Sequence, residues 1–266
     1  MMDISTHLDL NQNKINDQDS FLLVDFIIDE DISNTVCHEN YFIFDELLRT
    51  FLRRLIRDKN LIKEIRGSRP IILLSPGEYK PSMLNKVEDY KNEYVAYPPS
   101  GLIPFPGLAS QLACFCYIST NINDIYLVGR SFFVRYLSFL SSFTTNPNSV
   151  LSLLYNFDYI LETDKRFDHL NKHFSKLGFN SHITVLNWLS KSFSDLLTPV
   201  KILTLYDIII VTESTSILVT LSLAIFHYKK HTLLSLNTKE EILKLLDYLK
   251  YENLNLLDIL YDYLNS

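Results

Sequence analysis

From residue 107 onward the sequence consists of apolar runs with helical spacing, joined by short connections. Start and stop signals separate these runs. Pro199 follows Thr198 at a first helical position, a Thr-Lys-Glu-Glu capping box begins at Thr238, and Gly178 ends the helix expected near residues 166–177. Helices joined by short connections run antiparallel to their neighbours. The pattern therefore predicts an all-α domain. Further helix starts are expected at Asn123 or Asp124, Asn148 or Ser149, Asn180 or Ser181, and Ser214 or Thr215.

The first part of the chain is less regular. Residues 1–20 are polar and are expected to form a disordered tail, ahead of a helical domain over residues 21–266. A helix with a strong apolar stripe begins at Asp45, and its arginines (Arg49, Arg53, Arg54 and Arg57) lie off that stripe. We expect them to form a solvated basic face in preference to a partner-binding face. Seven of the nine prolines lie within residues 66–106, which predicts one long irregular loop there.

Composition excludes several classes of function. The chain has only 6 glycines in 266 residues, about a third of the usual share, and none begins a phosphate-binding loop. We therefore expect no nucleotide to be held by this chain itself. A net charge of −6 argues against nucleic acid as a partner. No segment is suited to span a membrane, and three unpatterned cysteines indicate a cytoplasmic protein.

No group of residues indicates a self-contained active site. Cys114 and Cys116 are expected to be small core residues, because a zinc site needs four ligands at characteristic spacings. His169 and His173 share a helix face, but no third ligand is near them. No nucleophile elbow is present either. The sequence therefore predicts no metal, no cofactor and no enzyme in its own right.

Three stretches, taken in order, resemble one known family. The first is Ile28-Asp-Glu-Asp31-Ile-Ser-Asn34-Thr35, and the second is Tyr97-Pro-Pro-Ser-Gly-Leu-Ile-Pro-Phe-Pro-Gly107. The third has the spacing Trp188-x₄-Phe193-x₃-Leu197, expected within one helix, followed by Leu203-Thr-Leu-Tyr206-Asp207 and Leu221-Ser-Leu-Ala224-Ile225-Phe226. Together they resemble the TBC domain, the all-α module of Rab GTPase-activating proteins, over roughly residues 20–255. A family-typical start is not evident before residue 21, so the domain is expected to lack its amino-terminal part.

The resemblance implies two catalytic positions, and both are altered. The family uses an arginine in I-x-x-D-x-x-R to neutralise charge in the transition state of the GTPase, and a glutamine in Y-x-Q-G to orient the attacking water. Here Asn34 stands at the arginine position and Pro106 at the glutamine position. The resemblance places partner contacts at Asp31, Asn34, Thr35, Phe105, Pro106 and Gly107. It assigns a structural role to Trp188, Phe193, Tyr206 and Asp207.

The resulting prediction is a degenerate TBC domain that regulates or binds a Rab-family small GTPase, which carries the GTP. It would act in vesicle trafficking, in the cytoplasm or on endomembranes through a partner. Two alternatives remain open. One is an active Rab GTPase activator that uses a non-standard arginine, with Arg49, Arg53 and Arg130 as candidates. The other is an all-α scaffold without GTPase contact, whose partner surface would be the loop at residues 66–106.

Overall fold

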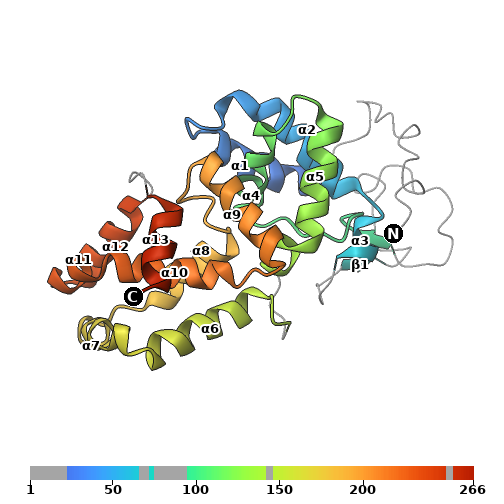
Figure 1. The fold of residues 1–266 in the computed structure, drawn as a ribbon. Helices are drawn as coiled ribbons and strands as arrows, with labels where there is room; N and C mark the ends of the chain where they lie inside the picture. Colours follow the sequence, from blue (N-terminus) through green and yellow to red (C-terminus); the bar gives the residue numbers. More distant parts are fainter. Residues whose placement is uncertain (1–22, 66–71, 75–94, 142–145, 250–253) are drawn as a thin grey trace.

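The computed structural model describes residues 23–65, 72–74, 95–141, 146–249 and 254–266 (Figure 1). The tail expected at residues 1–20 lies outside this part, as does most of the loop expected at 66–106. The α-helices are α1 (Leu23–Val36), α2 (Asp45–Arg57), α3 (Leu61–Glu64), α4 (Leu108–Ala113), α5 (Ile122–Arg135), α6 (Val150–Thr163), α7 (Asp168–Leu177), α8 (Ser181–Ser190), α9 (Pro199–Thr212), α10 (Ile217–Tyr228), α11 (Lys230–Ser235), α12 (Lys239–Tyr248) and α13 (Leu256–Leu264). Single 3₁₀ turns are η2 (Phe42–Phe44), η3 (Cys114–Tyr117), η4 (Leu137–Phe139) and η5 (Lys165–Phe167).

The all-α prediction is confirmed, and the helices form two groups. In the amino-terminal group α1 packs against α2 and α4, and α2 packs against α5. In the carboxyl-terminal group α10 packs against α6, α8 and α13. The blue and green helices of the first group lie apart from the yellow and red helices of the second in Figure 1, and α9 joins the groups by packing on η3. None of the helices described is long and apolar enough to cross a membrane.

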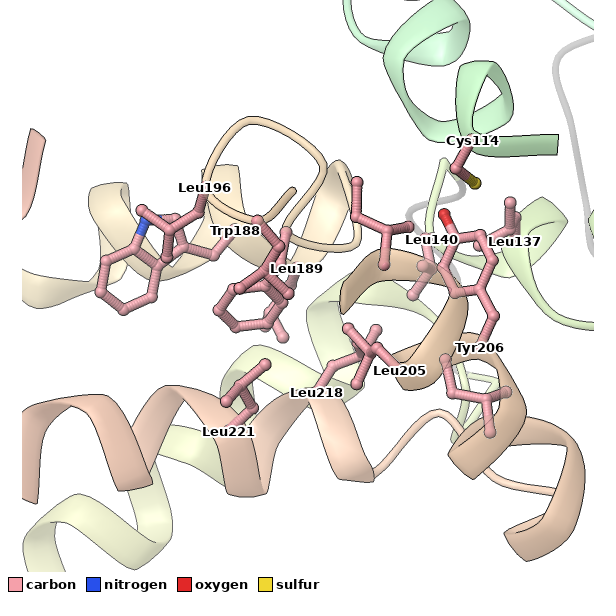
Figure 2. Packing of buried hydrophobic residues seen from close by; sticks show 14 of the residues in the cluster. Cys114, Leu137, Leu140, Trp188, Leu189, Leu196, Leu205, Tyr206, Leu218 and Leu221 are labelled. Carbon is pink, nitrogen blue, oxygen red and sulfur yellow. The ribbon is translucent and has the colours of Figure 1, made fainter. Parts of the chain in front are cut away.

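The hydrophobic core is continuous from one group to the other. α10 is buried along most of its length, from Leu218 to Phe226. Trp188 of α8 packs against Phe226 of α10, and in Figure 2 the hydroxyl end of Tyr206 points toward Cys114 in the other group. Each fully buried large apolar side chain contributes about 1.5–3 kcal/mol to folding, so this packing stabilises the arrangement of both groups.

Most helix ends follow the signals in the sequence. Ser149 caps α6, Asn180 caps α8, and the capping box at Thr238 is present with both hydrogen bonds. Gly178 ends α7 with φ of 64°. Two expected starts are wrong by a few residues, because Asn121 caps α5 and α10 begins only at Ile217.

Two further expectations need correction. Trp188, Phe193 and Leu197 do not share one helix, because α8 ends at Ser190 and the chain turns through positive φ at Ser192 and Phe193. Within the loop expected at residues 66–106, β1 (Ile72–Leu74) and β2 (Val95–Tyr97) form an antiparallel pair that aligns Ile72 with Tyr97. Such pairing between distant segments leaves no periodic signal in so short a stretch.

The arginines of α2 do not form the solvated basic face that we expected. Arg49 and Arg53 both bind the carboxylate of Asp29, and Arg57 binds Asp25 through two hydrogen bonds of 2.6 and 2.9 Å. The remaining arginine stacks on a tyrosine of α5. Because the two aspartates are one turn apart on α1, the charges of α2 are used to fix α1 in place.

Candidate functional site

The two stretches that the resemblance assigns to the catalytic positions meet at Asp31. One carboxylate oxygen of Asp31 accepts a hydrogen bond of 2.6 Å from the backbone N–H of Gly107, and the other accepts one of 2.6 Å from Ala109. Gly107 precedes the first residue of α4 with φ of 100°, so these are N–H groups that the helix itself leaves unpaired. A carboxylate is favourable at this end of a helix. α1 is thereby attached to the amino end of α4, although the two segments lie far apart in the sequence.

Asn34 and Pro106 both reach the surface beside this junction. Asn34 lies three residues after Asp31 on α1, which places the two residues on the same side of the helix. Pro106 directly precedes Gly107. Both side chains are exposed, whereas Thr35 is buried and donates its hydroxyl to the carbonyl of Asp31 at 2.9 Å.

Phe105, the remaining residue that the resemblance places at the partner contact, is half-buried and packs against the core. We call the exposed surface of Asn34 and Pro106 the junction face.

A third segment, which the sequence did not indicate, completes the junction. The side chain of Lys191 lies across Gly107 so closely that a Cβ on that glycine would be 2.9 Å from the Lys191 Cγ. The ammonium group of Lys191 forms an ion pair with Asp195. Two hydrogen bonds attach the segment to α4, from Gln111 Nε2 to the Ser190 carbonyl at 2.6 Å and between the hydroxyls of Ser110 and Ser194 at 2.8 Å.

Lys191 owes its position to the turn after α8. Ser192 and Phe193 have φ values of 47° and 62°, which non-glycine residues rarely adopt. The Ser192 hydroxyl is 2.8 Å from that of Tyr206, and the N–H of Phe193 donates to the Trp188 carbonyl at 2.8 Å. The contact between Lys191 and Gly107 joins segments that are far apart in the sequence, so no local signal indicated Lys191 as part of the site.

Burial decides the electrostatics of the junction. It raises the pKa of Asp31 above its usual range, although the N–H groups of Gly107 and Ala109 and the charge of Lys191 act in the opposite direction. The Asp31 carboxylate acts as a brace between α1 and α4, because each of its two oxygens accepts a hydrogen bond from the amino end of α4. The charge of Lys191 is offset by its ion pair with Asp195.

Trp188, Phe193 and Tyr206 lie in the core, whereas Asp207 is exposed. The Trp188 ring lies 5.8 Å from that of Phe193 and 5.7 Å from that of Phe226, measured between ring centres. Tyr206 donates its hydroxyl to the Gln111 carbonyl at 3.0 Å, which ties α9 to α4.

The alternative arginines are all engaged elsewhere. Arg49 and Arg53 bind Asp29, as described above. Arg130 binds Asp58 at 2.6 Å and Glu64 at 2.8 Å, and its side chain is 16% exposed. These neighbouring acids raise the pKa of Arg130. Each of these arginines connects secondary-structure elements, and each would have to leave its carboxylates to reach a partner.

Groups with metal-binding chemistry do not gather at the junction. Within the described part of the chain, no cluster of three histidine, cysteine or acidic side chains is arranged to hold a metal ion. Cys114 and Cys116 are buried, and burial raises the pKa of Cys116 to about 12. His173 is hydrogen-bonded to the carbonyl of Leu236 at 2.9 Å.

Comparison with known proteins finds similarity to one family. The family model described as the RabGAP TBC domain matches residues 130–259. The chain is also similar to TBC1 domain family member 19 of Homo sapiens, with 29% identity over 235 residues, which are 86% of this chain and 43% of that protein. The chain thus spans less than half the length of this relative. Both matches bear out the resemblance of this chain to the TBC domain of Rab GTPase-activating proteins.

Proposed function

We propose that this chain binds a Rab-family small GTPase at the junction face and does not supply the two catalytic side chains of an activator. The observation that carries the proposal is the double hydrogen bond from Asp31 to the N–H groups of Gly107 and Ala109. These bonds bring the two stretches with the altered positions to one place, where the side chains of Asn34 and Pro106 are both exposed.

The chemistry of the two exposed residues supports binding without catalysis. Asparagine is uncharged and shorter than arginine, so Asn34 cannot neutralise a developing phosphate charge. Proline has no side-chain hydrogen-bonding group, so Pro106 cannot orient a water molecule. An arginine finger accelerates GTP hydrolysis by about 10³–10⁵-fold, which corresponds to about 4–7 kcal/mol. No residue described at the junction offers a comparable contribution.

The ion pairs of the other arginines also support this proposal over an activator with a non-standard arginine. To act as a finger, Arg49 or Arg53 would have to leave Asp29, which would loosen the contact between α1 and α2. Arg130 would have to leave two carboxylates at once. The alternative therefore requires the amino-terminal group of helices to lose ion pairs that hold its helices together.

The test measures binding and hydrolysis in parallel over a panel of purified Rab GTPases. We expect at least one member, loaded with a GTP analogue, to bind the chain without faster hydrolysis of GTP. Acceleration beyond about tenfold would overturn the inactive interpretation. In that case, substitution of Arg49, Arg53 and Arg130 by alanine, one at a time, would show which arginine is used. Absence of any GTP-dependent partner would favour the scaffold function.

A gain-of-function variant tests whether the junction face faces the nucleotide. Replacing Asn34→Arg and Pro106→Gln together should restore measurable activation if the GTPase docks as the resemblance implies. The matched control places the arginine one residue earlier, as Ser33→Arg with Pro106→Gln, because Ser33 is also exposed on α1. Equal activity of both variants would show that the position of the arginine on α1 does not matter, which contradicts the proposed docking.

A further inference from the structure

An exposed apolar patch lies on the amino-terminal group, beyond the junction face. Phe42 and Ile43 of η2 are each 65% exposed, and Tyr117 and Ile118 at the end of η3 are 44% and 47% exposed. Single exposed apolar side chains are ordinary on protein surfaces, but large ones that gather in one place mark interaction sites. We call these four residues the η2 patch.

The contacts of Tyr117 attach η3 to the segment that contains Phe42 and Ile43. The Tyr117 hydroxyl donates a hydrogen bond to the Asn40 carbonyl, just before η2. The Tyr117 ring meets the Phe44 ring edge-on, with 4.8 Å between ring centres, and lies 6.2 Å from that of Tyr41. The residues on either side of Phe42 and Ile43 are therefore anchored to η3. A surface fixed in this way loses little conformational entropy when a partner binds.

The charges beside the η2 patch are acidic. Glu39 precedes η2 and Glu46 follows it one helical turn after Phe42, and both are exposed. Within the described residues, no ion pair involves either glutamate. The neighbouring arginines of α2 are turned toward α1, where Asp25 and Asp29 bind them. The rim of the patch therefore carries negative charge that a partner with basic side chains would complement.

The junction face and the η2 patch lie at the two ends of the segment formed by α4 and η3. α4 and η3 run from Leu108 to Tyr117, so the two ends are about 15 Å apart at 1.5 Å per residue. Asp31 is bonded at the first end, and Asn40 is bonded at the second. A typical protein interface covers about 800 Å² on each partner and extends further than this separation.

We propose that the η2 patch is the apolar docking site for the protein surface of the partner GTPase, and that this surface carries an apolar centre with a lysine- or arginine-rich rim. The inference rests on the proposed function and specifies the chemistry of the partner. Affinity would come from burial of Phe42 and Ile43, whereas Glu39 and Glu46 would set orientation and association rate. Such binding needs no catalytic finger.

The test compares affinities for the panel members that bind the unaltered chain. Phe42→Ala with Ile43→Ala should weaken binding by about tenfold or more. The matched control is Tyr155→Ala on α6, because that side chain is 71% exposed in the other group of helices. The control should leave affinity unchanged. Thermal unfolding of each variant checks the fold, and Ile118→Ser provides a second probe if the double variant does not fold.

Charge reversal tests the rim independently. Glu39→Lys with Glu46→Lys should weaken binding at low salt, and the difference should shrink as salt screens the charges. Unchanged affinity of the patch variants, an equal loss in the α6 control, or tighter binding after charge reversal would each overturn the inference while the proposed function stands. If the unaltered chain binds no member of the panel, the proposed function fails, and this inference fails with it.

Discussion

Replacing Asp31→Ala tests whether a single carboxylate joins α1 to α4. The change leaves the N–H groups of Gly107 and Ala109 without their acceptor at a part-buried site. Hydrogen bonds to a charged group contribute about 1.5–3 kcal/mol each, and two of them would contribute about 3–6 kcal/mol. Burial of the carboxylate opposes this, as the raised pKa of Asp31 shows. We therefore expect the free energy of unfolding to fall by about 3 kcal/mol, at the low end of that range.

Urea unfolding followed by circular dichroism measures this loss. The matched control is Ser33→Ala on the same helix, because the Ser33 hydroxyl is exposed and only bonds back to the carbonyl of Asp29. Its substitution should change stability by less than about 0.5 kcal/mol. A loss below about 1 kcal/mol for Asp31→Ala would refute the bracing role, and so would an equal loss in the control.

The variant Asp31→Asn separates charge from shape and predicts a pH dependence. Its amide oxygen can accept one N–H, but its NH₂ group faces the other donor, so we expect an intermediate loss. Because the pKa of Asp31 is raised by burial, the folded chain binds the proton more tightly than the unfolded chain. This preferential binding of the proton therefore stabilises the folded chain at low pH, and the stabilisation declines as the pH rises from about 4. Relative to Asp31→Asn, the unaltered chain should lose stability over that rise, and a gain would contradict the assigned direction.

Three further predictions use features that the same unfolding assays or simple chemistry can check. Gly107→Ala should destabilise the chain by about 1–2 kcal/mol more than Gly178→Ala, because both sites have positive φ but only a Cβ at Gly107 meets a neighbouring side chain. Equal losses would show that Lys191 yields freely. Arg57→Ala removes two hydrogen bonds to the buried Asp25 carboxylate and should cost about 3 kcal/mol, measured by urea unfolding. In thiol titration of the folded chain, Cys37 should react rapidly and the two buried thiols only after unfolding, because burial raises their pKa values. Fast reaction of more than one thiol would contradict this burial.

Local signals account for much of the fold. Helix starts at Ser149, Asn180 and Thr238 and the stop at Gly178 were predictable because each depends on contacts within a few residues. The same holds for the apolar stripe of α2, whose spacing alone indicates its buried side. The assignment of Asn34 and Pro106 to the two finger positions stays a prediction, because it rests on residue identities within motifs.

The errors arise where non-local contacts override local preference. The helix expected to continue from Trp188 to Leu197 ends at Ser190. The turn that follows is bonded to Tyr206 through the Ser192 hydroxyl, and two side chains of α4 bond to the residues on either side of it. The arginines of α2 looked solvated because periodicity shows which side of a helix is polar and does not show what that side meets. Their partners are aspartates of α1, which the fold places against α2.

The sequence by itself determined the class of the fold and the family that the chain resembles, because composition, periodicity and motif spacing are properties of the chain. Only the tertiary structure decided how the stretches that contain Asn34 and Pro106 relate to each other. Asp31 bonds across to Gly107 and Ala109, Lys191 covers the same glycine, and Phe44 packs against Tyr117. These contacts depend on the relative placement of helices, which side-chain packing and buried polar pairing set for the whole domain at once.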